Sequence, residues 1–188
     1  ANMEHPKALA AAGKAAAPQA FARNRLCGLG AAGFRATPET LVDRLLDPAV
    51  RVATSTPKAD PAGDYAFAMF ERIEQGGRAG AYRTLSEKAL QLTGGPNSPP
   101  PPKDRNAYGA LMAAGQADVF LTYCTNVVLA QREEPALVRI EVPDAVNVSA
   151  SYGVTVLNDA PESARAFVQF LLSPAGQAVL ARHGFAAP

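Results

Sequence analysis

Histidine and cysteine, the side chains that most often bind zinc, are scarce in this sequence. It contains two of each, and His5 and His183 stand near opposite ends of its 188 residues. A structural zinc site needs four ligands at short, regular spacings, so this scarcity argues against one. Cys27 and Cys124 permit one disulfide without requiring it, and separated thiols are more often buried as small apolar side chains.

A strong excess of charge is also missing. The formal net charge of +1 removes the main argument for a nucleic-acid or membrane-surface partner. No apolar run is long enough for a membrane span, and residues 1–6 lack the charged and apolar regions of a signal peptide. With 48% apolar and 19% charged residues, the chain is globular, with one medium domain or two small ones.

The most informative stretch is a strand, a loop and a helix within residues 52–75. Val52 begins a β-branched run, and Pro61 is placed in the first turn of an apolar-patterned helix. The amides of Ala62, Gly63 and Asp64 would then point out of a helix N-terminus, which attracts anions. The alternative is an ordinary loop with a well-capped helix, in which Asp60 and Asp64 are the capping residues.

The remaining pattern predicts an α/β fold. Besides the strand at 50–55, strands are expected at 21–30, 89–93, 119–123, 137–142 and 153–157. Besides the helix at 64–75, helices are expected at 3–17, 37–47, 78–88, 104–115, 126–132, 161–172 and 173–184.

Strands and helices alternate from residue 50 to 123, as in a doubly wound sheet. Ligands of such sheets lie beyond the carboxyl ends of the strands. The helix starts near Ala62 and Arg105 would meet at that edge, with Asp104 as the N-cap of the second helix. Two such helix starts together predict an anion site.

These residues resemble a known family, the periplasmic molybdate-binding and tungstate-binding proteins of ABC transporters. The resemblance covers essentially the whole chain. It is carried by four segments: Phe21–Leu26, Pro61–Tyr65, the strand ending in Tyr123, and Phe170–Gln177 followed by His183–Phe185.

The resemblance implies two doubly wound α/β lobes joined by crossing strands, with the anion in the cleft between them. Lobe 1 would comprise residues 1–20 and 146–188, and lobe 2 residues 21–145. The usual N-terminal strand–helix–strand portion, which supplies two serine hydroxyls to the anion, is not in this sequence, so lobe 1 would be incomplete.

Carried over residue by residue, the resemblance implies a ligand site at Ala62, Gly63, Arg105 and Tyr123. Backbone amides at Ala62 and near Arg105 would donate to a tetrahedral oxyanion, and so would the Tyr123 hydroxyl. It also implies a periplasmic monomer that delivers molybdate or tungstate to a membrane permease. No cofactor, catalytic residue, metal-ligating side chain or nucleic acid would be involved.

Three other functions stay open at this point. The bound oxyanion could be sulfate, because the choice of anion depends on the radius of the cavity. The same fold could serve as an intracellular oxyanion sensor with a partner chain. An ester hydrolase would need a nucleophile such as Ser55 or Thr56 with a base beside it, and neither histidine lies in a motif that supplies one.

Overall fold

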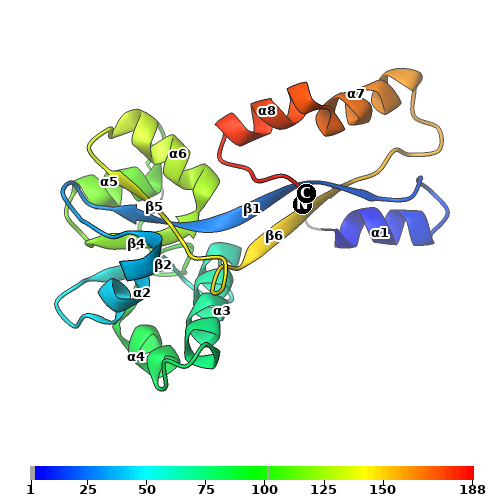
Figure 1. The fold of residues 1–188 in the computed structure, drawn as a ribbon. Coiled ribbons are helices and arrows are strands. Elements are labelled where there is room, and N and C mark those ends of the chain that lie inside the picture. Colours follow the sequence, from blue (N-terminus) through cyan, green and yellow to red (C-terminus); the bar gives the residue numbers. More distant parts are fainter. Residues whose placement is uncertain (1–2, 101) are drawn as a thin grey trace. The chain divides into compact units, whose positions relative to one another are not determined.

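A computed structural model of the protein describes residues 3–100 and 102–188 (Figure 1). The chain divides into two compact units: unit 1 is Ala1–Arg25 with Ser149–Pro188, and unit 2 is Leu26–Val148. These limits lie a few residues from the lobe limits expected from the sequence. Strand β1, Gln19–Gly30, contributes residues to both units.

Unit 2 is an α/β unit whose strands follow the alternating pattern. Its strands are β2 (Val52–Ser55), β3 (Leu90–Thr93), β4 (Val119–Tyr123), β5 (Val138–Glu141) and the second half of β1. Its helices are α2 (Pro38–Leu46), α3 (Pro61–Gln75), α4 (Ala81–Lys88), α5 (Ala107–Ala113) and α6 (Cys124–Glu133).

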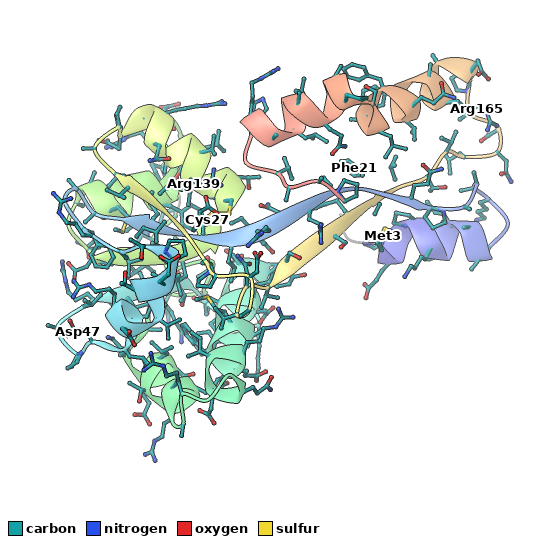
Figure 2. The ribbon with its side chains drawn as sticks, in the orientation of Figure 1. Met3, Phe21, Cys27, Asp47, Arg139 and Arg165 are labelled. Atoms are coloured by element: carbon teal, nitrogen blue, oxygen red, sulfur yellow. A yellow bond between two sulfur atoms is a disulfide. The ribbon has the colours of Figure 1, made fainter. Side chains whose placement is uncertain are left out.

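The sheet of unit 2 has the strand order β3-β2-β4-β1-β5. Strand β2 pairs in parallel with β3 and β4, whereas β1 runs antiparallel to β4 and β5. Cys27 and Arg139 mark β1 and β5 in Figure 2. The doubly wound arrangement expected between residues 50 and 123 is therefore confirmed, and the carboxyl ends of β2, β3 and β4 share one edge.

Two apolar cores lie on the two faces of this sheet, because successive strand residues point to opposite sides. Val119, Leu121 and Tyr123 of β4 belong to the core with α2, α3 and α4, which includes the fully buried Phe70. Phe120, between them in β4, belongs to the core with α5 and α6. Figure 1 shows these two groups of helices on opposite sides of the sheet.

Helix boundaries in unit 2 follow local signals closely. Thr37 and Thr40 form a reciprocal capping box at the start of α2, with Pro38 in the first turn, and Asp47 ends this helix. The start expected for α5 is wrong: Asn106, not Asp104, is the N-cap, and its Oδ1 accepts the Gly109 amide at 2.9 Å. Lys103 and Asp104 form a turn before the helix instead.

Where the chain leaves unit 2, a buried asparagine fastens its two crossing segments together. Asn147 Oδ1 accepts the Leu26 amide at 3.1 Å, and its Nδ2 donates to the Leu26 carbonyl at 2.9 Å. The side chain therefore completes the backbone hydrogen bonds of β1 at the point where strand pairing changes from unit 2 to unit 1.

Unit 1 contains the first half of β1, paired antiparallel with β6 (Ser149–Val154), and helices α1 (Glu4–Ala11), α7 (Glu162–Leu172) and α8 (Pro174–Arg182). The strand expected at 153–157 is mostly wrong. Its apolar residues suggested that position, but pairing with Gln19–Arg25 places the strand four residues earlier along the chain. The ring of Phe21, labelled in Figure 2, packs near that of Tyr152 on β6, with ring centroids 6.4 Å apart.

In the described ranges 3–100 and 102–188, no helix has both the length and the apolar character that a bilayer span requires.

Candidate functional site

All four residues predicted to bind the ligand lie in unit 2. Ala62 is in the first turn of α3, 1% exposed, and its amide donates to Asp60 Oδ1 at 2.9 Å. Asp60 is thus the N-cap of α3, as the capping alternative expected. The amide proposed to meet an anion is occupied by a carboxylate in this structure.

Gly63, the next residue, lets α3 begin directly against the end of β2. A Cβ atom at this position would lie 2.5 Å from the Ser55 carbonyl oxygen and 2.6 Å from the Thr56 carbonyl carbon. Its amide donates to the Asp60 carbonyl at 2.9 Å. The structure therefore shows a packing reason for glycine here, whereas its ligand role stays a prediction.

Tyr123, the last residue of β4, lies on the α3 side of the sheet. Its ring packs against Tyr65 of α3 at a centroid distance of 5.8 Å. Tyr65 follows Ala62 by three residues, which places the two on neighbouring positions of one helical face. The structure thus brings the Tyr123 phenol and the first turns of α3 to the same side of the sheet.

Arg105 lies just before the N-cap of α5, and its side chain is turned to another helix. The guanidinium group forms an ion pair with Glu134, and the neighbouring Asn106 amide donates to Glu133 Oε2 at 2.7 Å. Both carboxylates belong to the carboxyl end of α6. The contacts that the structure gives Arg105 and Asn106 are with Glu133 and Glu134, and the ligand role of Arg105 stays a prediction.

A cluster of hydroxyl groups at the same sheet edge was only partly anticipated. Ser55 Oγ lies 2.8 Å from Thr93 Oγ1 and 3.4 Å from the Tyr108 hydroxyl. Thr56 Oγ1 donates to the Thr93 carbonyl at 3.0 Å. Ser55 and Thr56 were named from the sequence, but Thr93 and Tyr108 were not assigned to the site. The position of Thr93 at the end of a strand was the signal that could have found it.

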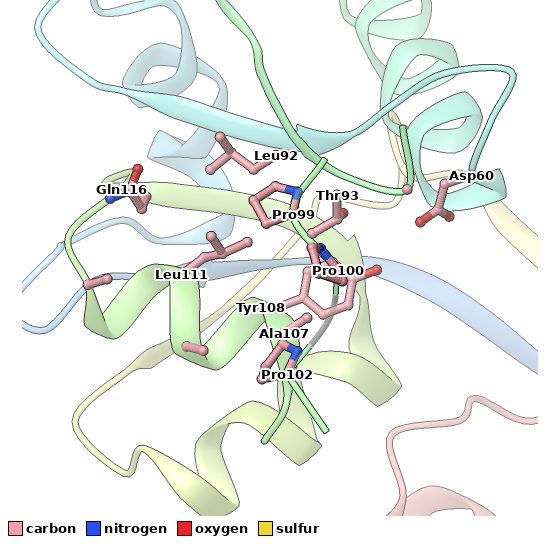
Figure 3. A pocket seen from close by; sticks show the side chains of 13 residues that line it. Asp60, Leu92, Thr93, Pro99, Pro100, Pro102, Ala107, Tyr108, Leu111 and Gln116 are labelled. Atoms are coloured by element: carbon pink, nitrogen blue, oxygen red, sulfur yellow. The ribbon is translucent and has the colours of Figure 1, made fainter. Parts of the chain in front are cut away.

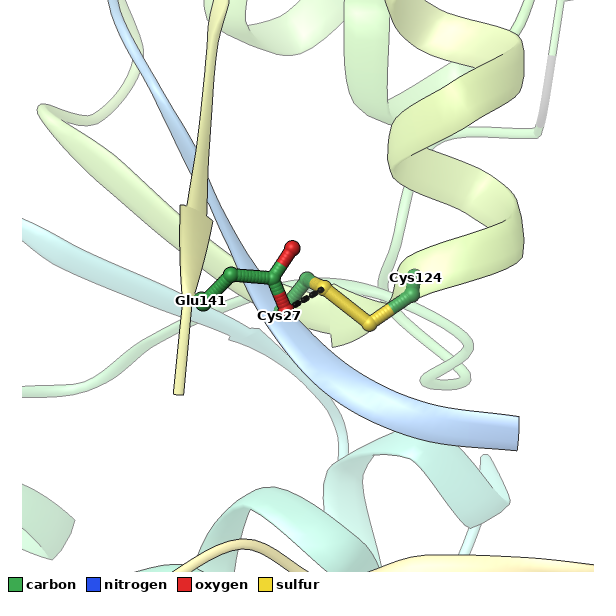
Figure 4. A group of neighbouring side chains, drawn as sticks. All are labelled: Cys27, Cys124 and Glu141. Carbon is green, nitrogen blue, oxygen red and sulfur yellow. Dashed lines mark hydrogen bonds between the residues drawn. A yellow bond between two sulfur atoms is a disulfide. The ribbon is translucent and has the colours of Figure 1, made fainter. Parts of the chain in front are cut away.

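A disulfide joins β1 to the start of α6. Cys27 and Cys124 are bonded, with Cα atoms 4.8 Å apart, which decides a pairing that the sequence left open (Figure 4). The sequence could not show that strand pairing brings these residues together. Cys124 directly follows Tyr123, so the bond fixes the backbone next to the predicted ligand hydroxyl.

Glu141 lies beside this disulfide, with Oε2 3.8 Å from Cys27 Sγ (Figure 4). The ligand atoms of these three residues lie within 4.8 Å of one another. Metal ions bind cysteine as the thiolate, and both sulfur atoms are committed to the disulfide here. The cluster is therefore not a metal centre in the oxidised protein.

The family follows from a match over nearly the whole sequence. A family model described as bacterial extracellular solute-binding protein matches residues 1–186. The chain belongs to this family. This solute-binding protein is 34% identical over 186 residues to an uncharacterized protein of Pasteurella multocida (strain Pm70), a match that covers 98% of this chain and 76% of that protein.

A sulfate-binding protein of Synechococcus elongatus is 31% identical over 149 residues, which are 75% of this chain and 41% of the relative. Among solved structures, a substrate-binding domain from Clostridium difficile attributed to a molybdenum ABC transporter superposes with a TM-score of 0.77. That match has 19% identity and covers 100% of this chain and 75% of the other. The expected fold class, that of the periplasmic solute-binding proteins, is confirmed.

Proposed function

We propose that this solute-binding protein binds a small tetrahedral oxyanion in the periplasm and delivers it, chemically unchanged, to the membrane permease of an ABC importer. Molybdate or tungstate is the proposed ligand. Family membership supports transport, and the relatives described in terms of molybdenum and sulfate support an oxyanion as the cargo.

The observation that carries this proposal is the placement of Tyr123 on the α3 side of the sheet, against Tyr65. In the proposed site, the carboxyl end of β4 would offer the Tyr123 hydroxyl, and the amino end of α3 would offer the Ala62 amide that Asp60 now caps. Helix N-termini favour anions through these amides and through the helix dipole. Neutral donors also suit a ligand that must be released again.

Asp60 has a defined part in this proposal. Its carboxylate caps the Ala62 amide at 2.9 Å, and it would repel an oxyanion at the same amide. We propose that the oxyanion takes over the Ala62 amide while Asp60 turns away. Without ligand, the start of α3 is stabilised by the Asp60 cap. When the oxyanion binds, it replaces the Asp60 carboxylate as the acceptor of the Ala62 amide.

The hydroxyl cluster gives no support to an ester hydrolase. A serine nucleophile needs an adjacent base to accept its proton. The hydrogen-bond partners that the structure gives Ser55 Oγ are the hydroxyls of Thr93 and Tyr108, which are not bases at neutral pH. We therefore propose binding without catalysis.

Calorimetry on the full-length protein tests the function. Molybdate, tungstate, sulfate and phosphate are titrated separately at one pH and ionic strength. We expect saturable heat with molybdate and tungstate and a weaker response to sulfate. Tighter binding of sulfate than of molybdate would change the cargo but keep the class. No heat with any tetrahedral oxyanion from folded protein would overturn the proposal.

A further inference from the structure

Unit 2 contains a cavity of about 670 Å³ on the α5 side of its sheet (Figure 3). Leu92 of β3, Tyr108 and Leu111 of α5, and Pro99 and Pro100 of the loop between them form its walls. Cavities of roughly 300–1,000 Å³ hold drug-sized ligands, so this space far exceeds the needs of a five-atom oxyanion. Its size and apolar walls call for an organic ligand.

The ends of the cavity are polar, and one of them is charged. Figure 3 shows Asp60 and Gln116 at opposite ends, with the apolar walls between them. Asp60 is the one ionisable carboxylate or amine among the described lining residues. Since the described lining residues include no lysine, arginine or histidine, an organic anion would meet the Asp60 carboxylate and none of these cations among them.

Asp60 lines this cavity while one of its oxygens holds the start of α3. Oδ1 accepts the Ala62 amide, whereas Oδ2 lies against Gly94, where an added Cβ would approach it to 2.7 Å. Gly94 itself lines the cavity and has φ +75°, a conformation that favours glycine. Because Gly94 has no side chain, the Asp60 carboxylate fits against the same stretch of backbone that lines the cavity.

We propose that this cavity is a second binding site, for an organic amine with a compact aliphatic or alicyclic body. The body would pack between Leu92, Leu111 and the prolines, and the ammonium group would meet Asp60 Oδ2. The Tyr108 ring adds a surface on which a cation is favoured. This site shares Asp60 with the oxyanion site proposed above, whereas its apolar walls belong to β3, α5 and the loop between them. Binding of the amine does not require that the oxyanion binds.

Three probes with the same ring test the charge preference: cyclohexylmethylamine, cyclohexylmethanol and cyclohexanecarboxylate. Binding to the full-length protein is measured by ligand-observed NMR competition. We expect the amine to bind about tenfold more tightly than the alcohol, as a charge-assisted contact provides. The carboxylate should bind weakest. Equal or tighter binding of the carboxylate would overturn the proposal, and so would no binding of any probe.

Two variants locate the binding. Ala110→Leu places extra volume in the cavity without opposing the helix, and we expect it to abolish binding of the amine and the alcohol. Ala113→Leu, on the same helix but outside the lining, should leave binding unchanged. Unchanged amine binding in Ala110→Leu would refute the location.

Asp60→Asn isolates the charge, because asparagine also caps helices well. We expect the variant to lose the preference for the amine over the alcohol while it still binds the alcohol. A retained tenfold preference would overturn the role of Asp60. Oxyanion calorimetry on Ala110→Leu separates the two sites: molybdate binding should persist there, whatever the result for the amine.

Discussion

The ring of Tyr123 packs against the ring of Tyr65, with centroids 5.8 Å apart and planes tilted by 60°. One tyrosine ends a strand and the other lies in the second turn of α3. Aromatic pairs at this separation contribute to stability and fix the orientation of both rings. The contact therefore holds a phenol beside the helix start at which we propose that the oxyanion binds.

Tyr123→Phe removes the hydroxyl and keeps the ring contact. If the hydroxyl donates to the oxyanion, its loss should cost about 1.5–3 kcal/mol of binding, a roughly 10-fold to 150-fold rise in Kd. Molybdate calorimetry measures the change, and thermal unfolding checks that the fold is intact.

Tyr82→Phe is the matched control for this substitution. Tyr82 lies in α4, is 36% exposed and contacts Phe67 edge-on at 6.5 Å. The Tyr82→Phe variant should bind molybdate with the same Kd as the unaltered protein. Equal affinity in Tyr123→Phe and Tyr82→Phe would remove Tyr123 from the proposed site.

Asp60→Asn should strengthen oxyanion binding. The amide oxygen of asparagine can still accept the Ala62 amide, so the helix stays capped, but the negative charge is gone. We expect Kd for molybdate to fall at least about fivefold at low ionic strength, with a smaller gain in high salt.

Asp64→Asn removes the same charge four residues later, in the first turn of α3, where the carboxylate accepts the Lys58 amide at 2.7 Å. Its effect on Kd should be smaller. An equal gain in molybdate affinity in both variants would mean that net charge alone causes the effect. A loss of affinity in Asp60→Asn would contradict the proposed exchange of acceptors at the Ala62 amide.

Reduction of the Cys27–Cys124 disulfide should lower both stability and affinity. The bond closes a long loop, with 97 residues of sequence separation, and loss of a native disulfide typically costs about 2–5 kcal/mol. Urea unfolding with and without reductant measures the first effect. Because Cys124 follows Tyr123, molybdate Kd should also rise on reduction.

The double variant Cys27→Ala/Cys124→Ala provides the control for this experiment. It should be less stable than the oxidised protein, and reductant should not change it further. An unfolding midpoint of the unaltered protein that stays constant after complete reduction, verified by thiol titration, would be inconsistent with a stabilising bond.

Local chemistry explains which parts of the fold could be predicted. Thr37 and Ser173 were recognised as helix starts because each precedes a proline and caps its own helix. The strand ending in Tyr123 has a strong β-branched and aromatic pattern. In these segments neighbouring residues carry enough information to define the element.

The parts that were missed depend on distant segments. The start of α5 was misplaced because Asp104 and Asn106 are both good N-cap residues. In the structure Asn106 is the N-cap, and this segment also contacts the end of α6, through the Asn106 amide with Glu133 and through Arg105 with Glu134. The disulfide could not be deduced because it follows from the register of β1 on β4, which pairs Cys27 with Thr122. In the candidate site, the helix start and Tyr123 were predicted, whereas the Thr93 and Tyr108 hydroxyls became evident only from the fold.

Gly63→Ala should damage the proposed site through packing alone. Its new Cβ would meet the Ser55 carbonyl at 2.5 Å, and backbone atoms cannot rotate away as a side chain can. The first turn of α3 must therefore move from the end of β2. Overpacking of this kind costs about 1–3 kcal/mol of unfolding free energy. We also expect weaker molybdate binding, since Ala62 moves with that turn.

Gly109→Ala is an unusually close control, because Gly109 holds the same third helical position in α5. There the added Cβ would lie 3.3 Å from the Ala130 side chain, and the higher helix propensity of alanine offsets the contact by about 1 kcal/mol. Urea unfolding should therefore show a much smaller change for Gly109→Ala than for Gly63→Ala. If the two variants have similar free energies of unfolding, the start of α3 tolerates displacement from β2. The close packing at Gly63 then does not determine the position of the Ala62 amide.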